Sequence, residues 1–190
     1  MDCRKSQNKS CECNTGCCGD VAEGQMEETR KIIIEFLYLD LDTCNRCQGT
    51  DDGLEAAITD VAKVLKLTGI DVVVKKIHID SKGKAIKYKF VSSPTIRING
   101  KDIQMEVKES YCESCGDLCG DDVDCRVWMY EGKEYDVPPK AMIVDAILRA
   151  VYGYTNATLD RGCNEETYEL PENLRRFFES IETNRNPGDE

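Results

Sequence analysis

The sequence predicts an α/β domain, and three consecutive segments support this prediction. The run KIIIEFLYL from Lys31 is almost continuously apolar and β-branched, as a central strand covered on both faces requires. Apolar residues then recur at three- and four-residue steps from Leu54 to Leu65, which is typical of an amphipathic helix. The segment IDVVVKKIHI at 70–79 reads as a second strand. A strand, a helix and a strand in this order predict a parallel, right-handed crossover.

The boundaries of the predicted helix have their own signals. Asp52 and Glu55 are spaced like an N-cap residue and its N3 partner, and Gly69 follows the last apolar position as a stop. We therefore expect the helix to begin near Asp52.

The remaining segments continue the α/β pattern. A short helix is predicted at 82–90, and a strand at 93–98 ends in Asn99-Gly100, a strong turn signal. Strand pattern resumes at 127–135, and a helix follows Pro138-Pro139 and closes at Gly153. A final helix begins near Pro171. The large apolar residues late in the chain are predicted to be core: Trp128, Leu174, Phe177, Phe178 and Ile181.

Composition divides the chain and excludes several partners. A net charge of −11 argues against nucleic acid and anionic membranes as partners, because the sequence shows no basic patch. No apolar run approaches the roughly 18 to 20 residues of a membrane span, and the start lacks a secretory core, so we expect a cytoplasmic protein. We expect a Cys-rich flexible tail at 1–29, a domain at 30–153 with a Cys-rich insertion at 104–125, and a C-terminal extension with one helix at 154–190.

Cysteine is the unusual component, with 12 in 190 residues. This is about 6%, below the roughly 8 to 10% of small disulfide scaffolds, and clustered cysteines in a reducing compartment bind metal or exchange disulfides more often than they hold a fold together. Cys44 and Cys47 form a Cys-x-x-Cys pair after the first strand, where a lowered thiol pKa would provide a thiolate for disulfide attack or for a soft metal. We expect both sulfur atoms to be exposed, with Cys44 as the nucleophile.

Two further clusters of cysteines are candidate metal ligands. In the tail these are Cys11, Cys13, Cys17 and Cys18, whose alternative interpretation is a disordered tail with incidental thiols. In the insertion they are Cys112, Cys115, Cys119 and Cys125, the four thiolates that a tetrahedral zinc site or an iron–sulfur cluster needs. Local disulfides or free thiols in a surface loop are the alternative for the insertion.

The order of elements from Lys31 to Gly153 resembles the thioredoxin superfamily. In particular, TCNRC at 43–47 and SSPTIRING at 92–100 resemble a poorly characterised thioredoxin-like family of small, Cys-rich prokaryotic proteins. The resemblance implies a mixed four-stranded sheet flanked by helices, with the Cys-rich insertion between the last two strands. It also implies a cis proline at Pro94, packed beside Cys44 and Cys47, so that these three residues form the catalytic set.

The same topology predicts two separate thiol sites. The dithiol lies at the carboxyl end of the first strand, whereas the tail, the insertion and Cys163 join the domain at the opposite pole. We therefore expect a second thiol-rich site remote from Cys44, although a 22-residue insertion could fold back, since each residue spans up to about 3.3 Å.

Two features distinguish the motif from those of redox thioredoxins. It has no preceding Trp and no internal Pro, and residues 48–52 separate the dithiol from the expected helix start, which would weaken the helix dipole at Cys44. Nearby carboxylates, those of Asp40, Asp42, Asp51 and Asp52, would also disfavour a thiolate.

The function favoured by these observations is thiol-based binding or transfer of a soft metal or metalloid ion, with zinc, an iron–sulfur cluster or another thiophilic ion as the group bound. A thiol–disulfide oxidoreductase using Cys44 and Cys47 is the main alternative. A non-catalytic, partner-binding module with a structural metal is the third. The partner expected is a thiol-containing or metal-handling protein.

Overall fold

The computed structural model describes residues 30–120, 122–153 and 168–185. In chain order its elements are β1 (Arg30–Tyr38), α1 (Asn45–Leu67), β2 (Ile70–His78), α2 (Lys82–Lys87), β3 (Thr95–Ile98), β4 (Lys101–Asp102), β5 (Lys108–Tyr111), α3 (Glu113–Cys119), β6 (Asp124–Tyr130), β7 (Lys133–Tyr135), α4 (Lys140–Tyr152) and α5 (Glu172–Arg185).

The larger sheet has four strands in the order β2-β1-β3-β4. β1 and β2 are parallel, in register from Arg30 beside Ile70 to Tyr38 beside His78, whereas β3 runs antiparallel to β1 and to β4. The parallel pair confirms the predicted crossover. The mixed four-stranded sheet is confirmed as well.

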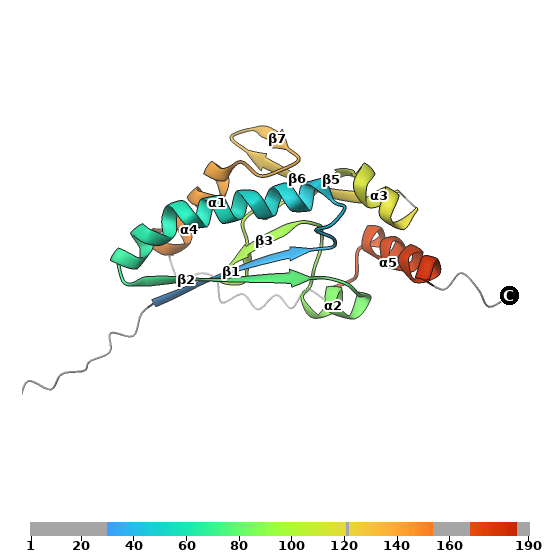
Figure 1. Cartoon of the computed structure of the whole chain (residues 1–190), viewed down its shortest axis with the longest axis horizontal. Coiled ribbons are helices and arrows are strands. Elements are labelled where there is room, and N and C mark those ends of the chain that lie inside the picture. Colours follow the sequence, from blue (N-terminus) through green and yellow to red (C-terminus); the bar gives the residue numbers. More distant parts are fainter. Residues whose placement is uncertain (1–29, 121, 154–167, 186–190) are drawn as a thin grey trace, which may run out of the picture.

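β1 lies inside this sheet because its side chains are apolar on both faces. Ile34, Phe36 and Leu37 are completely buried. Figure 1 shows α1 and α4 along one side of the sheet and α2 on the other side, near the carboxyl ends of β1 and β2. The predicted apolar face of α1 is confirmed, since Leu54 and Leu65 are fully buried.

The predicted start of this helix is wrong, because α1 begins at Asn45 and not after Asp52. Contacts distant in sequence support the extra turns. A Cβ at Gly49 would lie 2.7 Å from a methyl group of Val137, so glycine permits a close approach there. Asp51 forms an ion pair with Lys76 of β2 at 2.7 Å. The acidic and glycine residues that resemble a boundary therefore lie inside the helix.

The turn at Asn99-Gly100 is confirmed, with φ of 50° and 80° at the two residues, and the chain returns from it as β4. The strand pattern predicted at 127–135 is confirmed, because this segment contains most of β6 and all of β7. Glu131 and Gly132 also have positive φ, and they divide this segment into the hairpin of β6 and β7.

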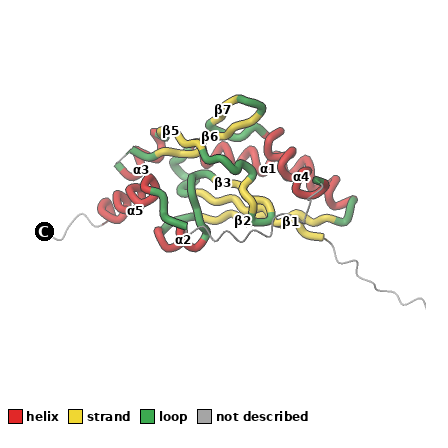
Figure 2. Tube along the Cα trace, turned by 180° about the vertical axis from the view of Figure 1, so that it is seen from behind, coloured by secondary structure: helices red, strands yellow, loops and turns green. Residues whose placement is uncertain are grey.

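This hairpin belongs to a second sheet of three antiparallel strands in the order β5-β6-β7. Figure 2 shows the second sheet beside α3 and on the same side of the larger sheet as α1. Residues 104–125 contribute β5, α3 and the start of β6. The expected insertion between the last two strands of one sheet is not confirmed, because β6 pairs in the second sheet.

The C-terminal helix α5 packs against α3 and α2, as Figure 1 shows at the right of the molecule. Leu174, Phe177 and Phe178 are at most 3% exposed, and Trp128 is completely buried. The prediction that these residues form core is therefore confirmed.

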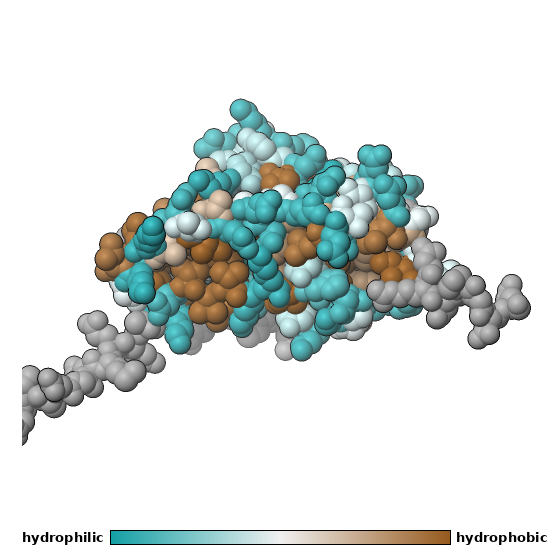
Figure 3. Space-filling model, in the orientation of Figure 1, coloured by the Kyte–Doolittle hydropathy of each residue, from teal (hydrophilic) through white to brown (hydrophobic). Residues whose placement is uncertain are grey.

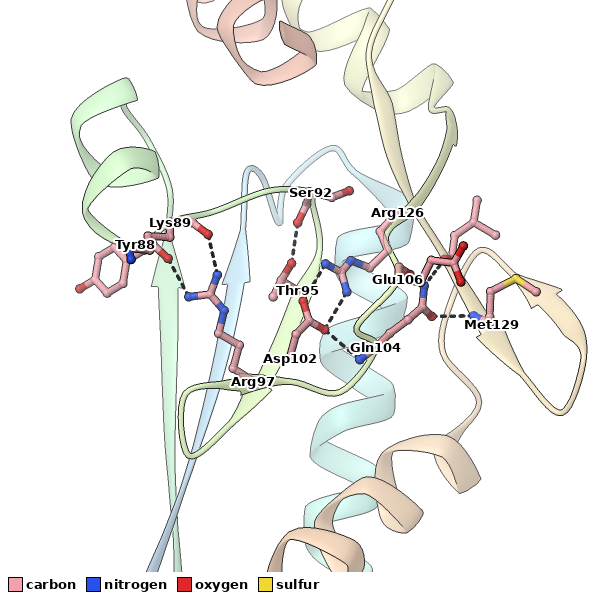
Figure 4. A network of polar contacts seen from close by, with 11 residues as sticks. Tyr88, Lys89, Ser92, Thr95, Arg97, Asp102, Gln104, Glu106, Arg126 and Met129 are labelled. Atoms are coloured by element: carbon pink, nitrogen blue, oxygen red, sulfur yellow. Dashed lines mark hydrogen bonds and ion pairs between the residues drawn. The ribbon is translucent and has the colours of Figure 1, made fainter. Parts of the chain in front are cut away.

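A buried polar network joins the two sheets (Figure 4). Arg126 of β6 is completely buried, and its two terminal nitrogens each lie 2.8 Å from a carboxylate oxygen of Asp102 in β4. Gln104 donates to the carbonyl of Val127 at 3.1 Å and accepts from the N–H of Met129 at 2.7 Å. The chain between β4 and β6 is thus held by side chains as well as by strand pairing.

An exposed apolar area covers part of α1 and β2 (Figure 3). The exposed large apolar residues of these two elements are Val64 and Leu67 in α1 and Val73 and Val74 in β2. Within the described parts of the chain, the helices are too short or too polar to cross a membrane.

We predict that Asp102→Ala lowers the free energy of unfolding by about 3 kcal/mol, because it leaves the buried guanidinium of Arg126 without its counter-charge. Urea denaturation measures the change. The control is Glu134→Ala, which breaks the exposed ion pair with Lys108 and should cost less than about 1 kcal/mol. Equal losses in the two variants would contradict the prediction.

Candidate metal centre

Cys44 lies at the junction of β1 and α1. The carboxylate of Asp40 accepts the backbone N–H of Cys44 at 3.3 Å, and it also accepts the N–H of Thr43. Cys44 is the N-cap residue of α1, and its Sγ accepts the N–H of Cys47 at 3.4 Å. The expectation that α1 starts too late to influence Cys44 is therefore wrong, because the sulfur lies at the positive end of the helix dipole.

Three further cysteines come from the β5–α3–β6 segment. Cys112 precedes α3 as its N-cap residue, and Cys115 lies one turn later inside the helix. Cys125 lies in β6, where it is paired with Ser110 of β5. The N–H of Cys112 donates to the carbonyl of Val123 at 2.8 Å, which closes the segment into a compact unit.

These three sulfur atoms meet the sulfur of Cys44. The Sγ atoms of Cys44, Cys112, Cys115 and Cys125 all lie within 4.8 Å of one another, and we call this group the four-cysteine cluster. The Sγ atoms of Cys115 and Cys125 are 3.3 Å apart. The predicted separation of the dithiol from the thiols of residues 104–125 is therefore wrong, because this segment folds back over the amino end of α1.

The cluster fits one soft metal ion. Four thiolates around a tetrahedral zinc ion at about 2.3 Å lie about 3.8 Å from one another, close to the spacing found here. An iron–sulfur cube places each thiolate on a different iron, which requires a wider set of sulfur atoms. The donor set could hold a metal ion. It is also closed, since Cys44, Cys115 and Cys125 are 0% exposed and Cys112 is 4% exposed.

The four thiols share protons. Hydrogen bonds from Cys112, then Cys115 and Cys125, lower the pKa of Cys44 well below its ordinary value. A hydrogen bond from Cys115 lowers the pKa of Cys112 to about 7. Hydrogen bonding to Cys112 raises the pKa of Cys115 and of Cys125. The largest influences on the pKa of Cys44 are therefore the neighbouring thiols, and not the carboxylates that were expected to disfavour its thiolate.

Arg46 ties the two parts of the site together. Its guanidinium donates to the carbonyls of Ser110, Tyr111 and Cys125 at 3.1–3.2 Å and to the hydroxyl of Ser110 at 3.0 Å. It also forms an ion pair with Asp136 at 2.7 Å. Arg46 therefore binds the first turn of α1 to the backbone on both sides of α3. Its position between Cys44 and Cys47 is the only signal for this role in the sequence.

Cys47 lies outside the four-cysteine cluster. Its Sγ is 3.4 Å from the hydroxyl of Ser93, and the Ser93–Pro94 peptide bond is cis, as the resemblance implies. Hydrogen bonding to Cys44, followed by burial, raises the pKa of Cys47. The expectation that both sulfur atoms of the pair are exposed is wrong, because Cys44 and Cys47 are both 0% exposed.

The remaining candidate ligands have different outcomes. Cys119, the last residue of α3, is buried with its Sγ 3.9 Å from the carbonyl of Gly116, and it is not part of the four-cysteine cluster. The other candidates lie outside the described residues, so their roles stay predictions: Cys11, Cys13, Cys17, Cys18 and Cys163.

We predict that Arg46→Met weakens retention of a bound metal ion by about 10- to 100-fold, because groups that orient ligands affect affinity to this extent. Competition with a coloured chelator measures the affinity. Arg149→Met is the matched control, since Arg149 is exposed and pairs only locally with Asp145. Equal affinities in the Arg46 variant and the control would contradict the positioning role.

Comparisons with known proteins support one assignment. No curated protein and no solved structure gave a significant match to the chain. Residues 32–147 match the family model described as a domain of unknown function, DUF2703, and this range contains most of β1 and all four members of the four-cysteine cluster. The chain therefore belongs to the DUF2703 family.

Proposed function

We propose that this protein has a thioredoxin-like fold and binds one soft divalent metal ion such as zinc. The ligands are Cys44, Cys112, Cys115 and Cys125. The observation that carries the proposal is the convergence of four buried sulfur atoms within 4.8 Å. Thiolates in tetrahedral sets of four favour zinc-like ions over hard cations. A three-coordinate metalloid would use fewer donors than the cluster offers.

Three features support the ion as the partner of this cluster. One sulfur atom comes from the N-cap residue of α1 and three come from the β5–α3–β6 segment, so a bound ion would cross-link α1 to that segment. Burial excludes water that would otherwise compete for the ion. The guanidinium of Arg46 donates to the backbone carbonyl of Cys125 and supplies positive charge near the thiolates.

The thioredoxin-like fold is supported by the order of elements. A Cys-x-x-Cys pair follows β1 and starts α1, and β2 is parallel to β1. The cis Ser93–Pro94 bond directly precedes β3, and the hydroxyl of Ser93 lies 3.4 Å from the Sγ of Cys47. The three-stranded sheet and α3 are additions to this plan that bring the further cysteines to the pair.

A second candidate function is thiol–disulfide exchange by Cys44 and Cys47, which is favoured by the contact between them and by the nearby Pro94. Complete burial of both sulfur atoms favours the metal site instead. Replacement of Cys47 separates the two functions, because Cys47 belongs to the pair and not to the four-cysteine cluster.

We predict that the full chain with Cys11, Cys13, Cys17 and Cys18 replaced by serine binds one equivalent of cobalt(II) with the absorption of a four-thiolate site. In this background, Cys112→Ser or Cys125→Ser should reduce the thiolate-to-metal absorption and weaken binding. Cys47→Ala and Cys119→Ala are the matched controls and should leave the spectrum unchanged. A spectrum that changes with Cys47→Ala and not with Cys125→Ser would refute the assignment.

We also predict that metal affinity rises with pH between pH 6 and 8. The raised pKa values of Cys115 and Cys125 mean that the ion must displace their protons, so a lower proton concentration favours binding. Two displaced protons would increase the affinity by about 100-fold per pH unit near pH 8, and the increase should be steeper near pH 6, where Cys112, with its pKa of about 7, also releases a proton on binding. Zinc titrations in buffers of different ionisation enthalpy measure the number of protons released. A pH-independent affinity would contradict this proton balance.

A further inference from the structure

A cavity of about 650 Å³ lies away from the four-cysteine cluster, where the chain after α2 meets β3 and β4. Its lining combines basic and apolar side chains, among them Lys87, Lys89, Arg97, Lys101, Val91 and Met105. We call it the basic cavity. Its volume is in the range of small-molecule sites, which is about 300–1,000 Å³.

The charge of the basic cavity is opposite to that of the whole protein. The chain has a net charge of −11, yet four basic residues line the cavity with a single acidic residue, Asp102. The carboxylate of Asp102 is already bound by both terminal nitrogens of Arg126. The cavity therefore presents a local positive charge in a chain that is acidic as a whole.

The guanidinium of Arg97 is held in place before any ligand arrives. Its terminal nitrogens donate to the carbonyls of Tyr88 at 2.7 Å and Lys89 at 2.9 Å, as Figure 4 shows. A guanidinium carries more N–H groups than these two bonds use. Because the side chain is already ordered, an anion that binds it incurs less loss of conformational entropy.

Apolar side chains complete the lining. Met105 is 87% exposed and Val91 is 39% exposed, although both belong to the residue types that folding normally buries. An inorganic anion would leave these side chains in water. A ligand with an apolar portion would cover them and gain free energy from the area removed from water.

We propose that the basic cavity binds a small organic anion, in which a carboxylate or phosphate group contacts the Arg97 and lysine side chains and an apolar portion covers Val91 and Met105. The proposal does not depend on the metal centre, because none of the four cluster cysteines lines the cavity.

The test is a titration of the full chain, followed by amide chemical shifts, with three probes: inorganic phosphate, phenyl phosphate and 3-phenylpropionate. We expect phenyl phosphate or 3-phenylpropionate to bind at least tenfold more tightly than inorganic phosphate, with shifts at residues 87–91 and 97–107. The tighter of the two organic probes identifies the anionic group. Binding of neither organic probe at millimolar concentration would overturn the proposal, and so would equal affinity for all three probes.

Two charge-reversed variants distinguish the effect of the cavity on probe binding from the effect of the protein's net charge. Lys87→Glu with Lys101→Glu should weaken binding of the organic probe at least tenfold. Lys63→Glu with Lys66→Glu changes the net charge by the same amount on the exposed surface of α1, outside the cavity lining, and should change binding less than twofold. Equal weakening in the two variants would overturn the cavity as the binding site.

Discussion

The contact of four buried sulfur atoms is the constraint on which the rest of this structure depends. Several thiolates in one buried place repel one another, so these thiols cannot all be ionised together unless a cation binds between them. The sulfur atom of Cys44 comes from the end of β1, and those of Cys112, Cys115 and Cys125 come from the β5–α3–β6 segment. The position of the second sheet, the burial of α3 and the packing of α5 are all compatible with this one meeting point.

Residues other than the cysteines hold the site in a fixed arrangement. Arg46 bonds to the backbone at Ser110, Tyr111 and Cys125, so the segments that carry the cysteines are fixed relative to α1 by a side chain that is itself not a ligand. The carboxylate of Asp40 also holds the backbone of Cys44 in place, because it accepts the N–H of that residue. Because such contacts hold the cysteines in place before an ion binds, they would reduce the rearrangement that metal binding requires.

Much of the main sheet could be predicted from the sequence, because its signals are local. The apolar run of β1, the periodicity of α1 and the Asn99-Gly100 turn each depend on neighbouring residues. The start of α1 could not be predicted in this way, because Gly49 and Asp51 resemble loop residues until Val137 and Lys76 pack against them.

The candidate site was only partly predictable for a related reason. The clustering of Cys112, Cys115 and Cys125 in the sequence predicted them as candidate ligands, but nothing local showed that they join Cys44. The topological argument placed them at the opposite pole because β3 runs away from Cys44, so the segment that follows β3 leaves the sheet at its far end. β4 has only two residues, after which the chain leaves the sheet and returns over α1. The basic cavity was missed because its charges come from residues 87–89, β3 and β4, which are dispersed in the sequence.

The ion pair between Asp102 and Arg126 has a consequence for communication within the protein. Asp102 lines the basic cavity, and Arg126 directly follows Cys125 in β6. One ion pair therefore connects the lining of the cavity to a cysteine of the cluster. An anion in the cavity that drew the guanidinium of Arg126 away from Asp102 would pull on the backbone next to that sulfur. Thermodynamic reciprocity then requires that an ion at the sulfur atoms alter the affinity for the anion by the same factor.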